Sequence, residues 1–486
     1  MSSRNENTEK KIIIVGAGIA AIAAARELYK GHDHHFDLKI LEASHRAGGR
    51  VLSTVTDGIP VDLGATFIHG TTNENVIYEL AKQFGQVSGS GDWRPMWNES
   101  TMSVMLTNGE LVPNETVIEC WDKFLTLADE GQAVLDSETP LWANQYNDMY
   151  TFLAAEYPTL LGKDSCTMEV LKSHYYRGLF KCLIKFQAVV EGDTECRSTA
   201  IQGKFYDLPG IRDYRFGSGY SFGCFVKKLL EDLPKDTILY GREVVSINTE
   251  SNPTTVKCKN GDQFEADHVI VTIPLGVLKR RCLDENLISN ESPLFVPPLP
   301  VEKLKAIREL GFGCMGKMTL KFDQEITTKC KFNPLLILWR QEDEDDPIIK
   351  QKFPWATEFV QLERIYNSNL YETWMDASMI TSIENASDDE IAGAFSYILG
   401  KMFQHPVPKP VGVYRHGWSS DPLFYGAYTA DLAGVDTSAC ISTLEQPLYD
   451  NRLLFAGEAT SVDFYSTIHG AYWTGIREAS RIKQTM

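Results

Sequence analysis

Three features that mark common classes of protein are missing from this chain of 486 residues. Apart from residues 12–25, no apolar run has the length that spanning a bilayer requires. Positive charge is in deficit, since 65 Asp and Glu face 47 Lys and Arg. The resulting net charge of −18 disfavours nucleic acid and anionic membranes as partners. The sequence therefore predicts a soluble globular protein, and its length favours two domains.

Closely spaced cysteines are also absent. The ten cysteines are scattered, and no two of them form a Cys-x-x-Cys pair. This spacing argues against a zinc site or a redox dithiol, and it fits buried thiols in a reducing compartment. The acidic balance has two interpretations of equal weight: a field that attracts cationic substrates, or solubility alone.

Residues 12–25 are apolar, follow Lys10 and Lys11, and end in alanines, as a secretory signal peptide does. Cleavage after Ala25 would remove the glycine turn that follows the first predicted strand. We therefore expect the segment to stay in the folded protein as a strand and a helix.

The segment from residue 12 to residue 42 has the order of a dinucleotide-binding unit. A β-branched run ending at Val15 predicts a buried strand, Gly16 and Gly18 form a tight turn, and residues 19–29 have helical composition. Glycines let the backbone approach a pyrophosphate, and the helix N-terminus offers N–H groups and partial positive charge. Ala21 stands at the third small position of the fingerprint. Glu42 follows a second predicted strand and can accept from a ribose.

The residues after Glu42 indicate which dinucleotide binds. Arg46, Gly48, Gly49 and Arg50 follow in order, and this succession resembles that of the flavin amine oxidase family. The resemblance implies FAD as the cofactor. It also implies that Arg46 and Arg50 bind the pyrophosphate with their planar guanidinium groups, while Gly49 lets the chain pass close by.

Residues 62–70 resemble the family segment in which a Gly-Ala turn, here Gly64 and Ala65, runs along the flavin into the substrate cavity. Its ending, Ile68-His69-Gly70, is similar to the polyamine oxidase branch. The resemblance makes His69 a candidate substrate-binding residue, and the alternative is a structural histidine before a helix over residues 73–82.

Residues 86–113 look irregular, whereas the apolar spacing of residues 114–135 and 167–191 predicts helices. In the related branch an acid near the end of the second helix can hold a distal substrate amine, and here Glu191 and Glu195 are the candidates. The alternative for either is a solvated helix end.

Residues 221–233 predict a helix, and three strands over residues 241–272 return the chain to the first sheet. By the resemblance Val245 lies beside the adenine, with a plain core valine as the alternative. Further on, a run of small residues leads to Lys317, which resembles the flavin-facing lysine of the family. Lys317 would handle a proton near flavin N5 through one water, and the alternative is a lysine that extends to solvent.

Strands are expected over residues 335–339, 359–365 and 379–384, as an antiparallel sheet that roofs the substrate cavity. Ser387 predicts the cap of a helix over residues 388–403. The like-charged residues 342–346 predict a solvated loop.

The C-terminal part carries a second family resemblance. Glu458 follows a predicted strand and can accept from ribityl or ribose hydroxyls, while a helix beginning near Thr467 can direct N–H groups at the flavin. By the resemblance Trp418 and Ser466 bind the cofactor, and Tyr428 and Thr467 flank the flavin on the substrate side.

The resemblance runs from residue 12 to residue 481 and implies an α/β fold. We expect a discontinuous Rossmann-type FAD domain (1–85, 205–290 and 425–486) and an α+β substrate domain on an antiparallel sheet (86–204 and 291–424). Residues 463–467 contain no cysteine, so the flavin should be non-covalent. The chain ends Gln484-Thr485-Met486 rather than in a peroxisomal tripeptide, so the cytoplasm is the expected compartment.

The resemblance implies a polyamine oxidase that uses FAD and oxygen. Its substrate would be spermine, spermidine or an N1-acetylated form, without nucleic acid or membrane as partner, in a monomer or weak dimer. Two alternatives stand beside it: an oxidase of another amine (a monoamine, an amino acid or a lysine side chain), and a non-catalytic flavoprotein scaffold.

Overall fold

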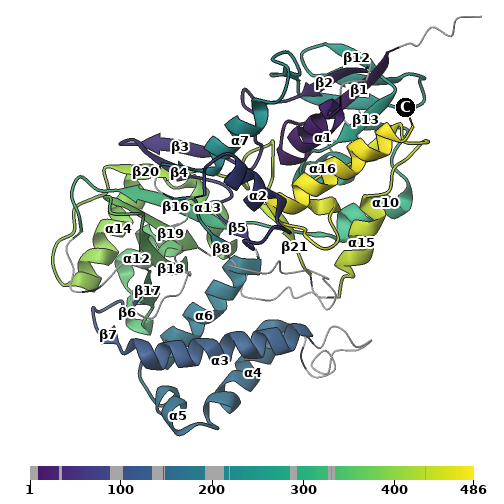
Figure 1. Ribbon diagram of the computed structural model, residues 1–486. Helices are drawn as coiled ribbons and strands as arrows, with labels where there is room; N and C mark the ends of the chain where they lie inside the picture. The colour runs from purple at the N-terminus through teal and green to yellow at the C-terminus, as the bar shows by residue number, and fades with distance from the viewer. Residues whose placement is uncertain are drawn as a thin grey trace, which may run out of the picture.

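The structure is a computed structural model of the whole chain. It describes residues 9–31, 36–87, 102–133, 146, 148–191, 213–217, 219–284, 293–326, 330, 334–375, 377–432 and 434–485. These residues form a mixed α/β protein with several sheets (Figure 1). The candidate Glu195 lies outside the described residues.

A five-stranded sheet contains the first expected strands, and its neighbouring strands are all parallel. Its spatial order is β22 (Leu453–Phe455), β13 (His268–Val271), β1 (Lys10–Val15), β2 (Phe36–Leu41) and β9 (Ile238–Leu239). Strands from four distant parts of the sequence therefore meet here, which confirms that the chain returns to the first sheet after residue 267.

Alternate residues of β1 face two different layers, as the period of two in a strand requires. Ile12 and Ile14 pack with the alanines of α1 (Ile19–Tyr29) and with α16 (Ile468–Lys483). Ile13 and Val15 pack on the other face with residues of β11 (Thr254–Cys258). The near-continuous apolar run of β1 is explained by burial on both faces.

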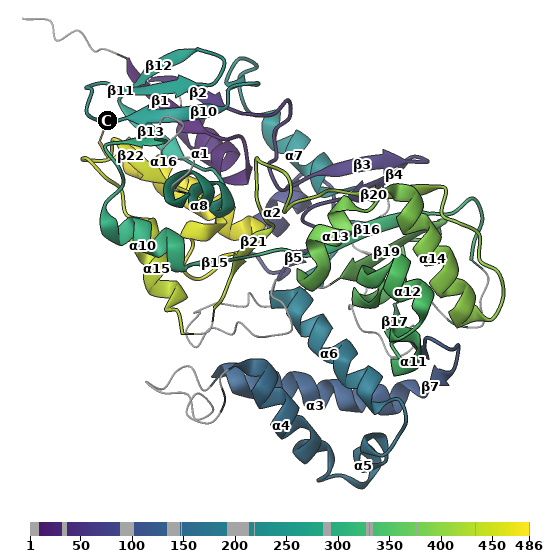
Figure 2. The same ribbon diagram turned by 180° about the vertical axis from the view of Figure 1, so that it is seen from behind.

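The second layer is a four-stranded sheet with helices beside it (Figure 2). Its order is β12 (Gln263–Ala266), β11, β10 (Val244–Asn248) and β14 (Phe295–Val296). The helices of the same apolar cluster are α8 (Leu275–Leu283), α10 (Val301–Glu309) and α15 (Thr437–Leu444).

A seven-stranded sheet forms the centre of the other half of the molecule. Its order is β20 (Gly412–Arg415), β16 (Gly316–Lys321), β19 (Leu370–Met375), β18 (Phe359–Arg364), β17 (Leu335–Leu338), β6 (Ser103–Leu106) and β7 (Leu111–Val112). Every neighbouring pair is antiparallel except β17 and β6, which are parallel.

Helices cover both faces of this sheet. One apolar cluster joins it to α3 (Asn114–Ala133), α4 (Met149–Leu161) and α6 (Tyr176–Glu191), and the other to α12 (Pro347–Lys352) and α14 (Asp388–Phe403). A further short helix, α5 (Ser165–Leu171), lies beside α4 at the edge of the molecule (Figure 1).

Short elements connect the two halves. The ribbons are β3 (Ser53–Thr56) with β4 (Ile59–Asp62), β5 (Ile68–His69) with β8 (Asp213–Tyr214), and β15 (Gly311–Gly313) with β21 (Tyr428–Ala430). The helices α2 (Val76–Gln83) and α7 (Phe222–Leu230) lie near them (Figure 1).

Several helices confirm the sequence predictions closely. The helix over residues 388–403 begins at a capping box in which Ser387 and Glu390 satisfy each other's backbone N–H groups. Within the expected helix over residues 114–135, the described residues 114–133 form α3. Within the expected helix over 221–233, residues 222–230 form α7 with Ser221 as its cap. The expected single helix over 167–191 is two, because the Ser173 hydroxyl donates to the Val170 carbonyl at 2.6 Å and ends α5.

The expected strand over residues 379–384 is wrong, because the segment is the helix α13 (Ile380–Asn385). The Arg415 guanidinium donates to the carbonyls of Ile383 and Ala386, which satisfies the helix C-terminus. The sheet position belongs instead to β19, which the sequence reading missed. Residues 86–113 were expected to be irregular, yet β6 and β7 lie there and join the sheet.

The expected solvated loop over residues 342–346 is also wrong. It forms the end of α11 (Gln341–Glu344), and Asp343 is only 2% exposed. The Asp343 carboxylate accepts from Thr107 at 2.6 Å and from Arg340 at 2.7 Å. It also pairs with Lys401 at 2.7 Å. Cations from distant segments therefore neutralise the run, which its own composition could not show.

Candidate functional site

The N-terminus of α1 lies at the end of β1, and no side chain caps its first turn. Gly16 has φ +94° and donates its N–H to the Leu41 carbonyl at 2.8 Å, which sets the turn between two parallel strands. A Cβ added to Gly18 would meet no atom within 4 Å. Ala21 is completely buried in α1. The helix therefore presents free N–H groups and partial positive charge to open space.

Glu42 stands just after the end of β2, beside this helix start. Its carboxylate accepts from the Ala17 N–H at 2.7 Å and from the Ser44 N–H at 2.8 Å. The Ser44 hydroxyl donates to the same oxygen as the Ser44 N–H, at 2.7 Å. The oxygen that accepts from Ala17 keeps a lone pair that a ribose hydroxyl could use.

The segment 46–50 passes over the same turn. Gly48 donates its N–H to the Ala17 carbonyl at 2.8 Å, and Gly49, at φ +59°, lies so close that a Cβ would be 3.3 Å from the Gly18 Cα. Arg46 donates to the carbonyls of Gly49 at 2.7 Å and Val51 at 3.1 Å. Burial lowers the pKa of Arg46, against the opposing charge of Glu42.

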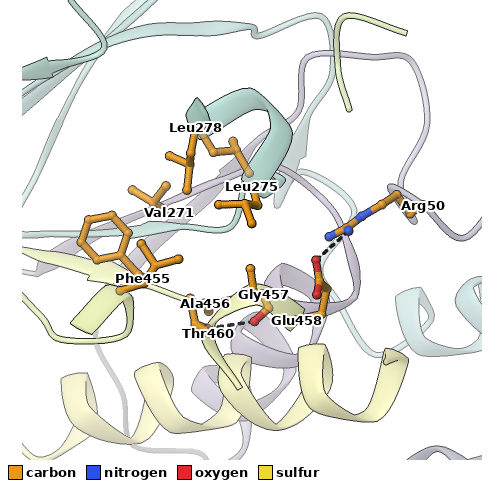
Figure 3. A pocket seen from close by; sticks show the side chains of 12 residues that line it. Arg50, Val271, Leu275, Leu278, Phe455, Ala456, Gly457, Glu458 and Thr460 are labelled. Atoms are coloured by element: carbon orange, nitrogen blue, oxygen red, sulfur yellow. Dashed lines mark hydrogen bonds and ion pairs between the residues drawn. The ribbon is translucent and has the colours of Figure 1, made fainter. Parts of the chain in front are cut away.

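Arg50 and Glu458 form an ion pair that lines one side of a cavity (Figure 3). The Arg50 Nη1 lies 2.8 Å from Glu458 Oε1 and donates to the Ala427 carbonyl at 2.8 Å. Ser466, at φ +65°, donates its N–H to the other Glu458 oxygen at 2.8 Å. The structure thus brings together an arginine from residue 50 and an acid from residue 458.

The same cavity has an apolar wall opposite the ion pair (Figure 3). Val271, Leu275, Leu278 and Phe455 point into it from β13, α8 and β22. Gly457 lies beside Glu458 at φ +132°, and a Cβ there would meet no atom within 4 Å.

These residues fit an FAD molecule by their chemistry. Open space beyond Gly18 and the uncapped helix suit a pyrophosphate, and the buried carboxylates of Glu42 and Glu458 suit hydroxyl groups. Val245 lies at a bulge of β10, and its carbonyl accepts from Arg281 at 3.2 Å.

Gly64 leads from this cofactor side toward the seven-stranded sheet. A Cβ at Gly64 would lie 2.0 Å from the Arg50 carbonyl and 3.0 Å from the Trp418 ring, so only glycine fits. Trp418 is buried and donates its indole N–H to the Leu63 carbonyl at 3.2 Å. Ala65 donates its N–H to the Arg50 carbonyl at 3.3 Å.

Lys317 lies on β16 directly against this turn and is 8% exposed, so it does not extend to solvent. Its Nζ donates to the Gly64 carbonyl at 2.6 Å and to the Thr66 hydroxyl. Burial lowers the pKa of Lys317, while the nearby carboxylates of Glu372 and Asp62 act in the opposite direction.

Two expected pocket residues come from β21 and the start of α16. The Tyr428 hydroxyl donates to the Val189 carbonyl of α6 at 2.9 Å. Thr467 caps α16 by accepting the Gly470 N–H at 3.0 Å, and it is 6% exposed. Glu191 is the last residue of α6, two residues beyond Val189, and its side chain lies outside the described part.

His69 lies at the end of β5, and its carbonyl accepts from the Asn75 amide at 2.6 Å. It is close enough to His469 to affect that ring electrostatically. Burial, with a smaller effect of His69, lowers the pKa of His469 to about 3. The His469 Nε2 has no hydrogen-bond partner among the described residues. His469 is therefore neutral at physiological pH.

Sequence reasoning missed Asp62, Glu372 and His469 as residues of this region. Asp62 and His469 lie inside segments that resemble the family. Their closeness in sequence to the predicted site residues could have identified them. Glu372 lies in a strand whose six residues are all buried. A buried acid indicates a functional or paired group, but the sequence analysis could not use this because it did not predict β19. Within the described ranges no three His, Cys, Asp or Glu side chains gather as a metal site would require.

The chain is similar to known proteins along almost its whole length. Residues 19–483 match the family described as flavin containing amine oxidoreductase. The chain is 30% identical to the peroxisomal N(1)-acetyl-spermine/spermidine oxidase of Homo sapiens, over 97% of this chain and 94% of that protein. It is 27% identical to the probable polyamine oxidase 5 of Arabidopsis thaliana, over 97% of this chain and 98% of that protein.

Proposed function

The chain belongs to the flavin containing amine oxidoreductases, and within this family we propose that it is an FAD-dependent oxidase of polyamines. The substrate is spermine, spermidine or an N1-acetylated form, and the products are an aldehyde, a shorter amine and hydrogen peroxide. The observation that carries the proposal is the position of Lys317, buried against the turn at Gly64 that leads away from the cofactor side. The names of the full-length relatives supply the substrate class.

When bound, FAD would supply the acceptor for a hydride from the carbon next to a secondary amine and would pass the electrons to oxygen, and water would hydrolyse the imine product. The protein supplies binding, orientation and the exclusion of water. The start of α1 with Gly16, Gly18 and Gly49 binds the pyrophosphate, Glu42 and Glu458 accept from hydroxyl groups, and Arg46 and Arg50 contribute positive charge. The bond to the protein is non-covalent.

Lys317 holds a proton at Nζ beside the reacting centre, directed by the carbonyl of Gly64 and the hydroxyl of Thr66. Tyr428, Thr467 and His69 line the substrate cavity, and Glu191 at the end of α6 accepts a distal amine. Support for this arrangement comes from the bond between Tyr428 and Val189, which ties the end of α6 to β21.

We place the five-stranded parallel sheet in a Rossmann-type cofactor domain and the seven-stranded sheet in the substrate domain. The division follows 1–85, 205–290 and 425–486 against 86–204 and 291–424. We extend the cofactor domain through α10, because β14 pairs with β10 and α10 packs in the same cluster as α15.

The described part of the chain contains no helix that is both long and apolar enough to cross a bilayer. The cysteine side chains that the structure describes form no disulfide with one another, which supports a reducing compartment, and we favour the cytoplasm. Imaging of the full-length protein with a fluorescent tag tests this: a punctate organellar pattern contradicts it. A monomer or weak dimer is the proposed assembly, and light scattering of the holoprotein tests it.

An oxygen-consumption screen of the purified yellow protein tests the function. Spermine, spermidine and N1-acetylated forms should consume oxygen with one hydrogen peroxide released per turnover. Consumption only with a monoamine, an amino acid or a lysine peptide would assign another amine oxidase. If no amine leads to oxygen consumption, the alternative that remains is a non-catalytic flavoprotein scaffold.

The role of Lys317 is tested by Lys317→Met, which keeps the volume and removes the charge. The variant should retain FAD but slow flavin reduction, flavin reoxidation or both, measured by stopped-flow absorbance. If both half-reactions stay within about twofold of wild type, roughly 0.4 kcal/mol in barrier, the role is wrong.

A further inference from the structure

Lys317 belongs to a cluster of buried charges whose other members come from distant segments. On the sheet, Lys317 of β16 is opposite Trp374 of β19, and Thr319 is opposite Glu372. Residues two apart on a strand share a face, so Lys317 and Glu372 lie diagonally on the same side of the sheet. Glu372 is 2% exposed.

Glu372 is held in place as a charged group. The Trp374 indole N–H donates to Glu372 Oε1 at 2.8 Å, and Arg215 Nη2 lies 2.5 Å from the same oxygen. The charges of Arg215 and Lys317 hold the pKa of Glu372 below its usual value, against the opposing effect of burial. A carboxylate with such partners stays ionised across the physiological range.

Asp62 approaches Lys317 from the end of β4. It accepts the Phe222 N–H at the start of α7 at 3.1 Å and the Ser53 hydroxyl. Burial raises the pKa of Asp62 to about 6, although Ser53, Lys317 and Arg215 act to lower it. Asp62 is therefore mostly charged only above that pH.

The charged groups around Lys317 act in opposite directions on its pKa. Among the described residues, Glu372 from β19 and Asp62 from β4 favour its ammonium form, and Arg215 after β8 disfavours it. On the remaining side Tyr414 of β20 is opposite Thr319 and bonds to Thr56 at 2.9 Å. Burial alone would favour the neutral amine, so the balance depends on the two carboxylates.

We propose that Glu372 and Asp62 are positioning residues for Lys317, keeping it protonated and directed at Gly64 and Thr66, with Arg215 holding Glu372 ionised. The proposal rests on the proposed function for its kinetic consequence. Neither carboxylate bonds to Lys317 in the way Gly64 and Thr66 do; each acts through its charge. Glu372 acts over the whole working range of pH, and Asp62 adds its charge only above about pH 6.

A purely structural reading exists, because the same cluster also ties the sheet to residues 62–69. Arg215 lies over the Phe67 ring at 5.2 Å, and Phe67 contacts Trp374 at 5.4 Å between ring centroids. Loss of this tie would lower stability at every pH without moving any titration midpoint. A pH profile therefore separates the two readings.

The test uses Glu372→Gln, with Glu363→Gln as the matched control. Glu363 of β18 is opposite Glu372 and lies 3.8 Å from the same Arg215 guanidinium, but its strand is one further from Lys317 than β19 is. For each holoenzyme the rate of flavin reduction by saturating spermine is measured anaerobically across pH. The substrate's own amines titrate alike in every variant, so differences belong to the protein.

Glu372→Gln should move the midpoint assigned to Lys317 to lower pH by about one unit, since loss of a neighbouring carboxylate disfavours the ammonium form. Glu363→Gln should move it by less than about a third of that, because its charge acts only through Arg215. In a Lys317→Met background, Glu372→Gln should move no midpoint. Asp62→Asn, the second variant should Glu372→Gln fail to fold, should shift the same midpoint in the same direction.

A second readout does not depend on turnover. The urea midpoints of wild type, Glu372→Gln, Lys317→Met and the double variant form a cycle at pH 8. The change caused by Glu372→Gln should be at least halved when Lys317 is already Met. An unchanged effect, or equal pH shifts in Glu372→Gln and Glu363→Gln, overturns the proposal. Should the wild type fail to oxidise any polyamine, the proposed function fails and the urea cycle alone decides the positioning role.

Discussion

At the scale of single residues, Gly18 differs from the glycines around it. Gly16, Gly48 and Gly49 have positive φ, which favours glycine for the backbone alone. Gly18 has φ −75° and ψ −176°, a conformation that any residue adopts. The backbone of the turn therefore does not require glycine at position 18. A pyrophosphate in the open space beyond Gly18 would require it, because a side chain would occupy that space.

Gly18→Val should consequently fold and yet be purified colourless. Its side chain meets no protein atom but occupies the space that a pyrophosphate needs at the helix start. The absorbance ratio at flavin and protein wavelengths measures the loading. Gly393→Val is the control, since its Cβ would meet only the end of Lys409 at 3.9 Å. A yellow, fully loaded Gly18→Val protein would refute the assignment.

The raised pKa of Asp62 makes the free energy of unfolding depend on pH, and the direction of the raise decides the sign. Its pKa in the folded protein, about 6, is above the ordinary 3.8 of the unfolded chain, so folding binds a proton between these values. Stability from this group therefore falls as pH rises from about 4 to 6, by at most roughly 3 kcal/mol for a shift of about two units.

Asp62→Asn removes that titration and keeps one acceptor oxygen, which can accept from both Ser53 and Phe222 as Asp62 Oδ1 does. The thermal midpoint of the variant relative to wild type should rise between pH 4 and pH 7, measured by differential scanning fluorimetry. A difference that is constant across this range would show that Asp62 titrates normally.

At the scale of elements, α6 carries a row of basic side chains that pair with acids of α11 and of residues 354–358. Arg177 and Lys181 pair with Glu344 at 2.6 and 2.8 Å, and Lys185 pairs with Glu358 at 2.9 Å. These cations repeat every four residues, and the fourth member of the series is Val189, which accepts from Tyr428. The row of pairs therefore ends at Tyr428, which we propose lines the substrate cavity.

We call the ion pairs of Arg177 and Lys181 with Glu344 the clamp of α6. Glu344→Gln should weaken this clamp and, through the end of α6, the binding of substrate. Hydrogen bonds from Arg177 and Lys181 lower the pKa of Glu344 despite its burial, so the charge is present at neutral pH. We expect a lower thermal midpoint, from a loss of about 1–3 kcal/mol, and a KM for spermine several-fold higher. Glu342→Gln, an exposed member of the same run, is the control. Equal behaviour of the two variants would contradict the clamp.

The elements also show what the sequence could predict. The strand, turn and helix over residues 10–29 follow from local chemistry, and so does the capping box at Ser387. Residues 342–346 and 379–384 were read wrongly because their partners, Lys401 and Arg415, are far away in sequence. The residues of a segment do not reveal which distant cations will pair with its acids, or which distant donors will satisfy the carbonyls at the end of a short helix.

At the scale of the whole molecule, the candidate site is assembled from segments near residues 16, 50, 215, 317, 372 and 458. Short motifs predicted the cofactor side, since each motif carries its own chemistry. Glu372 was not predictable as a neighbour of Lys317, because the register of β16 with β19 is a property of the folded sheet.

The net charge of −18 leads to a prediction about substrate capture. A polyamine carries several positive charges, so raising salt from about 20 to 200 mM should lower kcat/KM by roughly threefold or more through screening. The effect should be smaller for a monoacetylated substrate, which has one charge fewer. Steady-state oxygen-electrode assays at fixed pH measure it, and equal or absent salt dependence would mean that the acidic balance serves solubility alone.

Oxidation of polyamines is tested by anaerobic mixing of the purified protein with spermine and N1-acetylspermine. We predict that the flavin absorbance near 450 nm bleaches with a polyamine and returns when oxygen is admitted, with hydrogen peroxide formed in equal amount. Benzylamine and a free amino acid, at the same concentration, should leave the spectrum unchanged. A spectrum that persists with every polyamine, or that bleaches only with another amine, would contradict the account.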